Sequence, residues 1–117
     1  MTMERDELRQ VVVEALEEWI GPARAKLAGR WHGGKMILQP ENESLKPKEI
    51  DVEALFHKIV MVRESLRVLE QKINNHPKLD DEDRVVLQQY ITRCYGSLTT
   101  FNVLFRDEED RFIGQRE

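Results

Sequence analysis

Cysteine is nearly absent from this chain of 117 residues, in which Cys94 is the single example. One cysteine cannot form an intrachain disulfide, so no disulfide framework holds the fold. The sequence also lacks an apolar run of the about 20 residues that a membrane-spanning helix needs. Its charged first ten residues contain no apolar signal-peptide core. These absences predict a protein of the reducing cytoplasm that does not bind a membrane.

Short catalytic and metal-binding signatures are missing as well. The sequence has no G-x-S-x-G, H-E-x-x-H, C-x-x-C or phosphate-binding loop, and no Glu-x-x-His of the kind that di-iron bundles use. Glu53 and His57 lie four residues apart, but one such pair leaves a zinc site unfilled. We therefore expect no metal, no cofactor and no enzymatic activity. A small enzyme, or an enzyme subunit whose site a partner completes, is an alternative.

The charge balance argues against a general nucleic-acid-binding protein, because the net charge is −4. Residues 22–40 nevertheless carry four basic residues and no acid. With an aromatic ring and a Gly-Gly pair, this basic segment has the composition that binds phosphates or stacks single-stranded bases. Its candidate residues for binding an anion or a partner are Arg24, Lys26, Arg30, Trp31, His32 and Lys35. Local pairing with acidic helix faces is the favoured interpretation, and a nucleic-acid-associated protein is the alternative.

What the sequence does have is helical periodicity. Apolar residues step by three and four along two stretches, the first of which spans three heptads. These patterns predict helices over residues 51–75 and 80–106, and the short connection between them requires an antiparallel hairpin. Asp51 is expected to cap the first of these helices. The residues expected to be buried in the hairpin are Ile59, Val62, Leu66, Leu69, Ile91, Cys94, Leu98 and Phe101.

The segments before this hairpin are less regular. An amphipathic helix is predicted over residues 4–20, and Gly21-Pro22 separates it from a short segment over residues 22–28. Residues 29–50 are expected to be irregular. Within them Gly33-Gly34 is a turn signal, and a short β-ribbon would pair the residues just before this turn, 30–32, with those just after it, 35–39.

Residues 107–117 are predicted to form a charged tail in which Phe112-Ile113 is an isolated apolar pair. The pair suits either a fraying last helical turn or a short docking motif, and the sequence leaves both open. The whole chain fits one domain over residues 1–117. Its predicted fold class is mainly all-α, a three-helix or helical-hairpin bundle with a short β-ribbon as an option in residues 29–40.

The predicted function is a non-enzymatic helical protein–protein interaction module: an adaptor, a small regulatory subunit or a self-assembling structural protein. Helix 51–75 carries more apolar residues than its seam, the stripe of apolar positions spaced by three and four that packs in the hairpin, requires. This surplus predicts a second, self-associating face and a dimer. The residues of this face are Phe56, Val60, Met61 and Val68. In the alternative, residues 29–50 cover the face as a lid that uses Trp31, Met36, Ile37 and Leu38.

Overall fold

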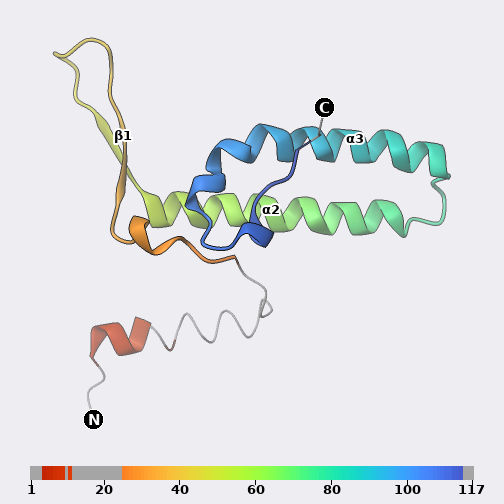
Figure 1. Ribbon diagram of the computed structural model, residues 1–117, viewed down its shortest axis with the longest axis horizontal. Helices are drawn as coiled ribbons and strands as arrows, with labels where there is room; N and C mark the ends of the chain where they lie inside the picture. Colours follow the sequence, from red (N-terminus) through yellow and green to blue (C-terminus); the bar gives the residue numbers. More distant parts are fainter. Residues whose placement is uncertain (1–3, 10, 12–24, 115–117) are drawn as a thin grey trace.

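The computed structural model describes residues 4–9, 11 and 25–114. These residues are mainly helical, with one two-stranded antiparallel sheet. The two long helices, α2 (Val52–Asn74) and α3 (Asp81–Leu98), lie antiparallel, as expected (Figure 1). A three-helix bundle is not confirmed, because most of the predicted helix over 4–20 lies outside the described residues. No helix among the described residues is long and apolar enough to cross a membrane.

The two helices begin in different ways. Asp80 caps α3 through a capping box, in which its carboxylate accepts the N–H of Asp83 at 2.7 Å and the Asp83 carboxylate accepts the N–H of Asp80 at 3.4 Å. The expected side-chain cap of α2 by Asp51 is wrong. Asp51 ends a strand and makes no capping hydrogen bond, and its carboxylate instead lies 3.9 Å from the Lys35 ammonium.

The helix predicted over residues 80–106 is too long, because the α-helix ends at Leu98. The chain continues as a 3-10 helix, η2 (Thr99–Leu104), and a further 3-10 turn, η3 (Glu108–Asp110), follows. Where the α-helix gives way to the 3-10 helix, the Thr99 hydroxyl donates to the Gly96 carbonyl at 2.9 Å, which satisfies one of the carbonyls at the helix end. The tighter winding ends the α-helix about two turns earlier than predicted and directs the next residues across the hairpin.

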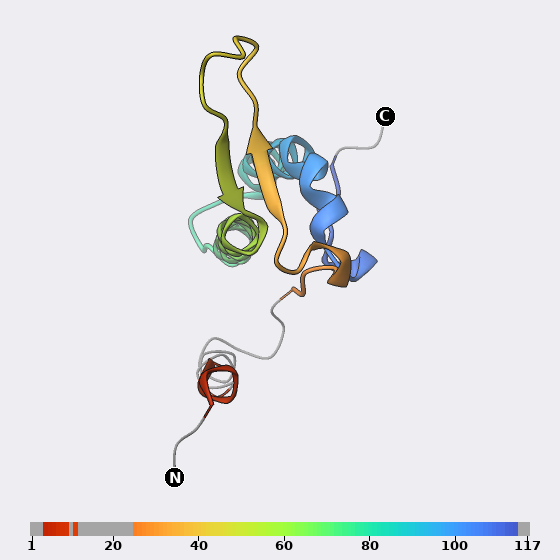
Figure 2. The ribbon, with the colours of Figure 1, turned by 90° about the vertical axis from the view of Figure 1, so that its left-hand side faces the viewer.

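The β-ribbon is present, but its second strand is not the predicted one. β1 (Lys35–Leu38) pairs antiparallel with β2 (Lys48–Asp51), whereas residues 29–31 form a 3-10 turn, η1 (Gly29–Trp31). Residues 30–32 do not pair with β1, because the Trp31 and His32 N–H groups donate to the Ala28 and Gly29 carbonyls of this turn, at 3.0 and 3.2 Å. The ribbon projects away from the helices (Figures 1 and 2). Of the four residues of the predicted lid, Ile37 and Leu38 are exposed, whereas Trp31 and Met36 are half-buried and pack against the core.

The core lies at the end of the hairpin opposite the α2–α3 connection. Phe105 is its most buried side chain and packs edge-to-face on Phe56 and Phe112, with ring centroids 5.1 and 5.6 Å away. Backbone hydrogen bonds join residues 26–28 to residues 104–106 beside this cluster. The buried residues of the cluster are Ala25, Leu27, Val52, Phe56, Ile59, Val60, Leu104, Phe105 and Phe112.

The chain after α3 returns along one side of the hairpin (Figure 2). Asn102 holds it there, because its side chain donates to the Phe112 carbonyl at 3.0 Å and accepts the Phe112 N–H at 2.7 Å. Further on, a Cβ atom at Gly114 would lie only 2.8 Å from the Gly96 Cα, so this close approach requires glycine. Of the isolated apolar pair, Phe112 is therefore a core residue and Ile113 is exposed.

Candidate functional site

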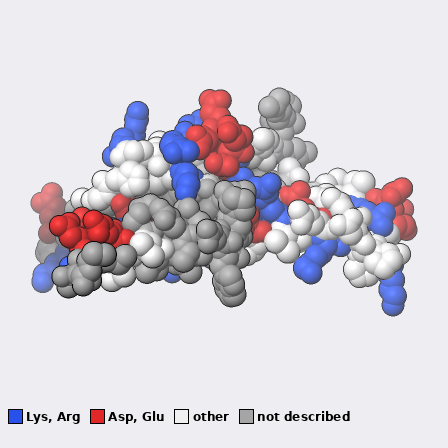
Figure 3. Space-filling view, turned by 90° about the horizontal axis from the view of Figure 1, so that it is seen from below, with Lys and Arg blue, Asp and Glu red and all other residues white. Residues whose placement is uncertain are grey.

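Acidic side chains accompany the basic segment. The Lys35 ammonium lies 3.4 Å from the Glu49 carboxylate, and the His32 Nδ1 lies 3.4 Å from the Glu53 carboxylate. Trp31 is half-buried, and its indole N–H donates to the Val103 carbonyl at 2.9 Å, which attaches this segment to η2. Figure 3 likewise shows basic and acidic groups interspersed on the face that it displays. These contacts agree with local pairing of the segment.

The other candidates of the basic segment lie in three different situations. Arg30 is exposed, and Lys26 is half-buried beside the core. Arg24 lies outside the described residues. His32 and Lys35 are exposed as well, but each lies within ion-pair distance of a carboxylate. Arg30 is the exposed cation of the described part of the segment that has no carboxylate partner. A single exposed guanidinium makes few phosphate contacts.

Glu53 has a structural role at the start of α2. Its carboxylate accepts the N–H of Gly33 at 3.1 Å, where the backbone has a φ of 74°, and lies 3.1 Å from the Arg9 guanidinium. The Gly33 N–H is the main reason that the pKa of Glu53 is lowered from its usual 4.5. Glu53 thus stabilises the turn before β1. Among the described residues, Glu53 and His57 are not joined by a third potential metal ligand.

We expect Glu53→Gln to lower the free energy of unfolding by about 1 kcal/mol at pH 7. The Gln amide oxygen can still accept the Gly33 N–H, so the loss is the usual difference between a hydrogen bond to a charged acceptor and one to a neutral acceptor. Because the pKa is lowered in the folded protein, the carboxylate stabilises it above about pH 4.5. This stabilisation is lost as the pH falls through the folded-state pKa. The difference between wild type and variant, measured by urea denaturation at several pH values, should therefore shrink below pH 4.5.

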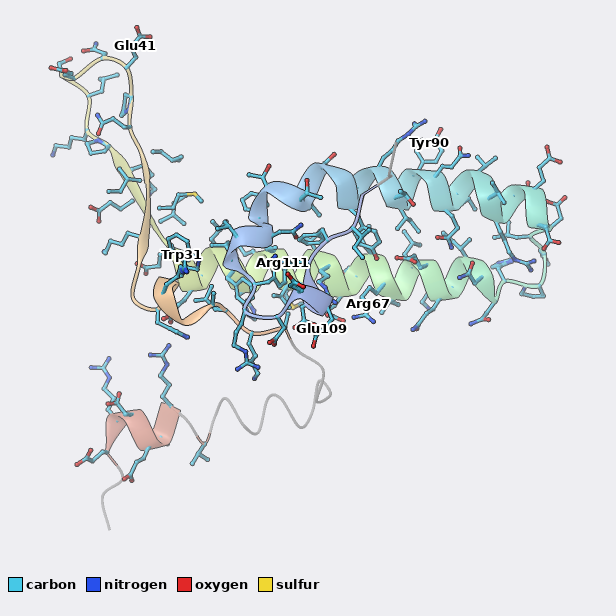
Figure 4. All side chains as sticks on the ribbon, viewed as in Figure 1. Trp31, Glu41, Arg67, Tyr90, Glu109 and Arg111 are labelled. Carbon is cyan, nitrogen blue, oxygen red and sulfur yellow. The ribbon has the colours of Figure 1, made fainter. Side chains whose placement is uncertain are left out.

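The matched control is Glu41→Gln, at an exposed glutamate in the connection between the strands, far from this turn (Figure 4). It should leave stability within about 0.5 kcal/mol of wild type. A Glu53 effect of equal size at pH 3 and pH 7 would contradict the role of the carboxylate charge.

The hairpin seam is buried along one edge only. Ile59 and Ile91 are buried as predicted, and Leu66, Leu98 and Phe101 are half-buried. Three residues of the predicted core are instead exposed, namely Val62, Leu69 and Cys94. The physical reason is that the chain after α3 packs on one side of the hairpin, so that the core uses Phe56 and Val60 and leaves the opposite side uncovered by the described residues.

The exposed seam residues of both helices lie on the same side of the hairpin. Residues two apart in an α-helix point about 200° away from each other. Val62 is two residues beyond the buried Val60, and Cys94 is two residues beyond Thr92, which faces the chain after α3. Leu69 is likewise two residues beyond Arg67, which faces the chain after α3. Leu87 and Tyr90 are two residues beyond Val85 and Gln88, which line a hollow together with Thr92. We call the resulting surface the seam face; it consists of Val62, Leu66, Leu69, Leu87, Tyr90 and Cys94.

The seam face is apolar over much of its surface and carries few charges. Its exposed fractions reach 46% for Val62, 47% for Leu69 and 59% for Tyr90, which is large for apolar and aromatic side chains that are regularly spaced. One helical turn before Val62 and Leu87 stand Lys58 and Asp83, which have opposite charges. Arg93 also lies over the Tyr90 ring, with its guanidinium carbon 5.4 Å from the ring centroid, so the face carries one positive charge beyond this pair.

The predicted self-associating residues divide between the core and the surface. Phe56 and Val60 are buried beneath the chain after α3, so the prediction that they form an exposed face is wrong. Met61 and Val68 are exposed and lie at the outer edge of α2, beside the seam face. Half of the surplus of apolar residues on α2 therefore belongs to the core.

A pocket of about 360 Å³ lies on the opposite side of the hairpin, where the chain after α3 crosses α2. Arg63, Arg67 and Arg111 line it, and Tyr95 donates a hydrogen bond to Glu70 at its edge. Burial, and then this hydrogen bond, raise the pKa of Tyr95. The sequence analysis did not identify these arginines. The four-residue spacing of Arg63 and Arg67 was the available signal, since it places both on one helix face.

Comparison with known proteins gives one match. The model of a family described as Domain of unknown function (DUF8685) matches residues 22–111, which include the ribbon, the hairpin and η3. No curated protein and no solved structure matches the chain. The matched region contains the seam face, the basic segment and the three arginines of the pocket.

Proposed function

We propose that this chain, which belongs to the family of domains of unknown function DUF8685, is a non-enzymatic helical interaction module that binds a second copy of itself through the seam face. The observation that carries the proposal is the exposure of regularly spaced apolar residues on one side of the hairpin. Val62 and Leu69 are 46% and 47% exposed, and Tyr90 is 59% exposed. Helices that present such a seam normally pack it against further helices.

The size of the face is adequate for a dimer. The 23 residues of α2 extend about 34 Å and the 18 residues of α3 about 27 Å, at 1.5 Å per residue. Two helices side by side are about 20 Å wide, so the whole side of the hairpin that carries the seam face covers roughly 600 Å². This is of the order of the about 800 Å² per partner that stable interfaces bury. The apolar residues at the edge of α2, Met61 and Val68, extend it further.

A second copy is also electrostatically acceptable as the partner. Lys58 and Asp83 carry opposite charges at the two ends of the face, and Arg93 over the Tyr90 ring adds one positive charge. The surplus of like charge that two copies bring together is therefore small. Pairing the same patch with itself is the commonest symmetry of soluble oligomers. Two hairpins packed face to face would form a four-helix arrangement in which the seam residues interlock.

The test is Val62→Glu, which places a carboxylate in the middle of the proposed interface. Burying an unpaired carboxylate costs several kcal/mol, so self-association should weaken at least about a hundredfold. Sedimentation equilibrium from low to high micromolar concentration measures the change. We expect a dimer for wild type and a monomer for the variant.

Val85→Glu is the matched control, because Val85 is 58% exposed on the other side of α3. It introduces the same charge at another exposed valine and should leave the dimer intact. A wild-type protein that stays monomeric at high micromolar concentration would overturn the proposal. So would equal effects of the two substitutions.

A further inference from the structure

The pocket between α2, α3 and the chain after α3 brings three guanidinium groups together. Figure 4 shows Arg67, Glu109 and Arg111 where η3 and the residues after it cross α2. Arg63 contributes the third guanidinium from one turn earlier in α2. Two of these arginines come from one helix face and the third from the far end of the chain, so the pocket exists only in the folded protein.

Arg63 is a buried charge whose donors are mostly unused. Its side chain is only 8% exposed, and one Nη1 hydrogen bond goes to the Glu64 carboxylate. The other contact, from Nη2 to the Asp110 carboxylate, is 3.8 Å long and therefore too long for a hydrogen bond. A guanidinium carries five N–H donors. Within the described residues, Arg63 thus has several donors without a protein acceptor, beside an open pocket.

The two other arginines are also weakly paired. Arg67 makes no hydrogen bond or ion pair with any residue that the structure describes. Arg111 lies 3.9 Å from the Glu108 carboxylate, in an ion pair exposed to solvent. The nearby Glu70 carboxylate already accepts the Tyr95 hydroxyl, and Glu109 is the second acid of the lining. Among the side chains that line this volume of about 360 Å³, three positive charges face two negative ones, while the Glu64, Asp110 and Glu108 carboxylates approach Arg63 and Arg111 from outside the lining.

We infer that this pocket binds a small molecule through an oxyanion, a phosphate or carboxylate group held by Arg63, Arg67 and Arg111. Arginine presents its donors in a planar fork that matches both groups, and such charge-assisted hydrogen bonds are the strong ones. The ring of Phe112 forms part of the wall and offers an apolar surface for the rest of the ligand. The volume lies within the range of small-molecule sites. The inference is independent of self-association, because the pocket and the seam face lie on opposite sides of the hairpin.

The experiment is a titration of the full-length protein with inorganic phosphate and, separately, with acetate, followed by amide chemical shifts in NMR at constant ionic strength. We expect saturable shifts at residues 63–70 and 111–113. Saturation by phosphate alone identifies a phosphate site, and saturation by acetate alone identifies a carboxylate site. Potassium chloride at the same ionic strength should produce no such shifts.

Arg67→Gln should weaken the binding about tenfold or more, since it removes one charged donor group. The matched control is Arg93→Gln, at an arginine of α3 that lies over the Tyr90 ring, on the other side of the hairpin. It should bind the anion as wild type does. The inference is overturned if neither anion gives saturable shifts in the pocket, or if the two variants weaken binding equally.

Discussion

Phe105→Ala is expected to lower the free energy of unfolding by about 3–5 kcal/mol, the range for removing a fully buried aromatic ring. Phe105 is 1% exposed and its ring packs between Phe56 and Phe112, so the truncation leaves a cavity that two other rings line. It also lies where residues 26–28 meet η2, and the loss therefore affects three parts of the chain at once. Urea denaturation followed by circular dichroism measures the change.

The matched control is Val103→Ala, two residues earlier, because Val103 is 56% exposed. It should change the stability by no more than about 0.5 kcal/mol. Phe105→Leu fills more of the site than Ala does and should cost less than Phe105→Ala, which keeps the test informative if the alanine variant does not fold. Equal losses for the variants at positions 103 and 105 would show that the core does not centre on Phe105.

The hairpin could be predicted from sequence because its signals are local. The three-and-four spacing sets where α2 and α3 run, and the acidic turn at Asp80 fixes where α3 begins. Asp51 shows the limit of such signals. A carboxylate before an apolar run is a capping signature, but here β2 runs directly into α2 and the ribbon partner Lys35 attracts the side chain instead.

Which edge of the seam is buried could not be predicted, because it depends on contacts distant in sequence. The pattern is equally apolar at Ile59 and Val62, and the chain after α3 decides between the two sides of α2. Gly96 carried a partial signal, since a small residue in a helix permits close approach, but the chain that approaches is Gly114 rather than a neighbouring helix. The α2 residues of the seam face were therefore predictable as regularly spaced apolar positions, but not as exposed ones.

The ribbon illustrates the same limit. Its turn signal at Gly33-Gly34 was correct, and Gly33 has the positive φ of 74° that favours glycine. The strand that pairs with β1, however, is separated from it by a connection of nine residues, 39–47, whose composition does not specify a pairing register. Across a connection of this length, local sequence patterns do not specify which segment pairs with a strand.

Phe112→Ala is expected to lower the free energy of unfolding by about 3–5 kcal/mol as well, although Phe112 lies near the end of the chain. It is 4% exposed, and its ring packs on Phe105 and lies 6.1 Å from the Tyr95 ring. Its backbone is held by both hydrogen bonds of the Asn102 amide. The tail that the sequence predicted to be charged and peripheral thus supplies a core residue, and its loss should be visible by urea denaturation.

Asn102→Ala tests the contribution of the Asn102 amide separately from that of the Phe112 ring. It removes both hydrogen bonds and should cost about 1–3 kcal/mol, because the Phe112 N–H and carbonyl are then left without their partner in a partly buried place. The two substitutions act on one attachment, so the loss in the double variant should be smaller than the sum of the single losses. Additive losses would mean that Asn102 and Phe112 stabilise the fold separately. In that case the amide would not be what holds the chain after α3 against the hairpin.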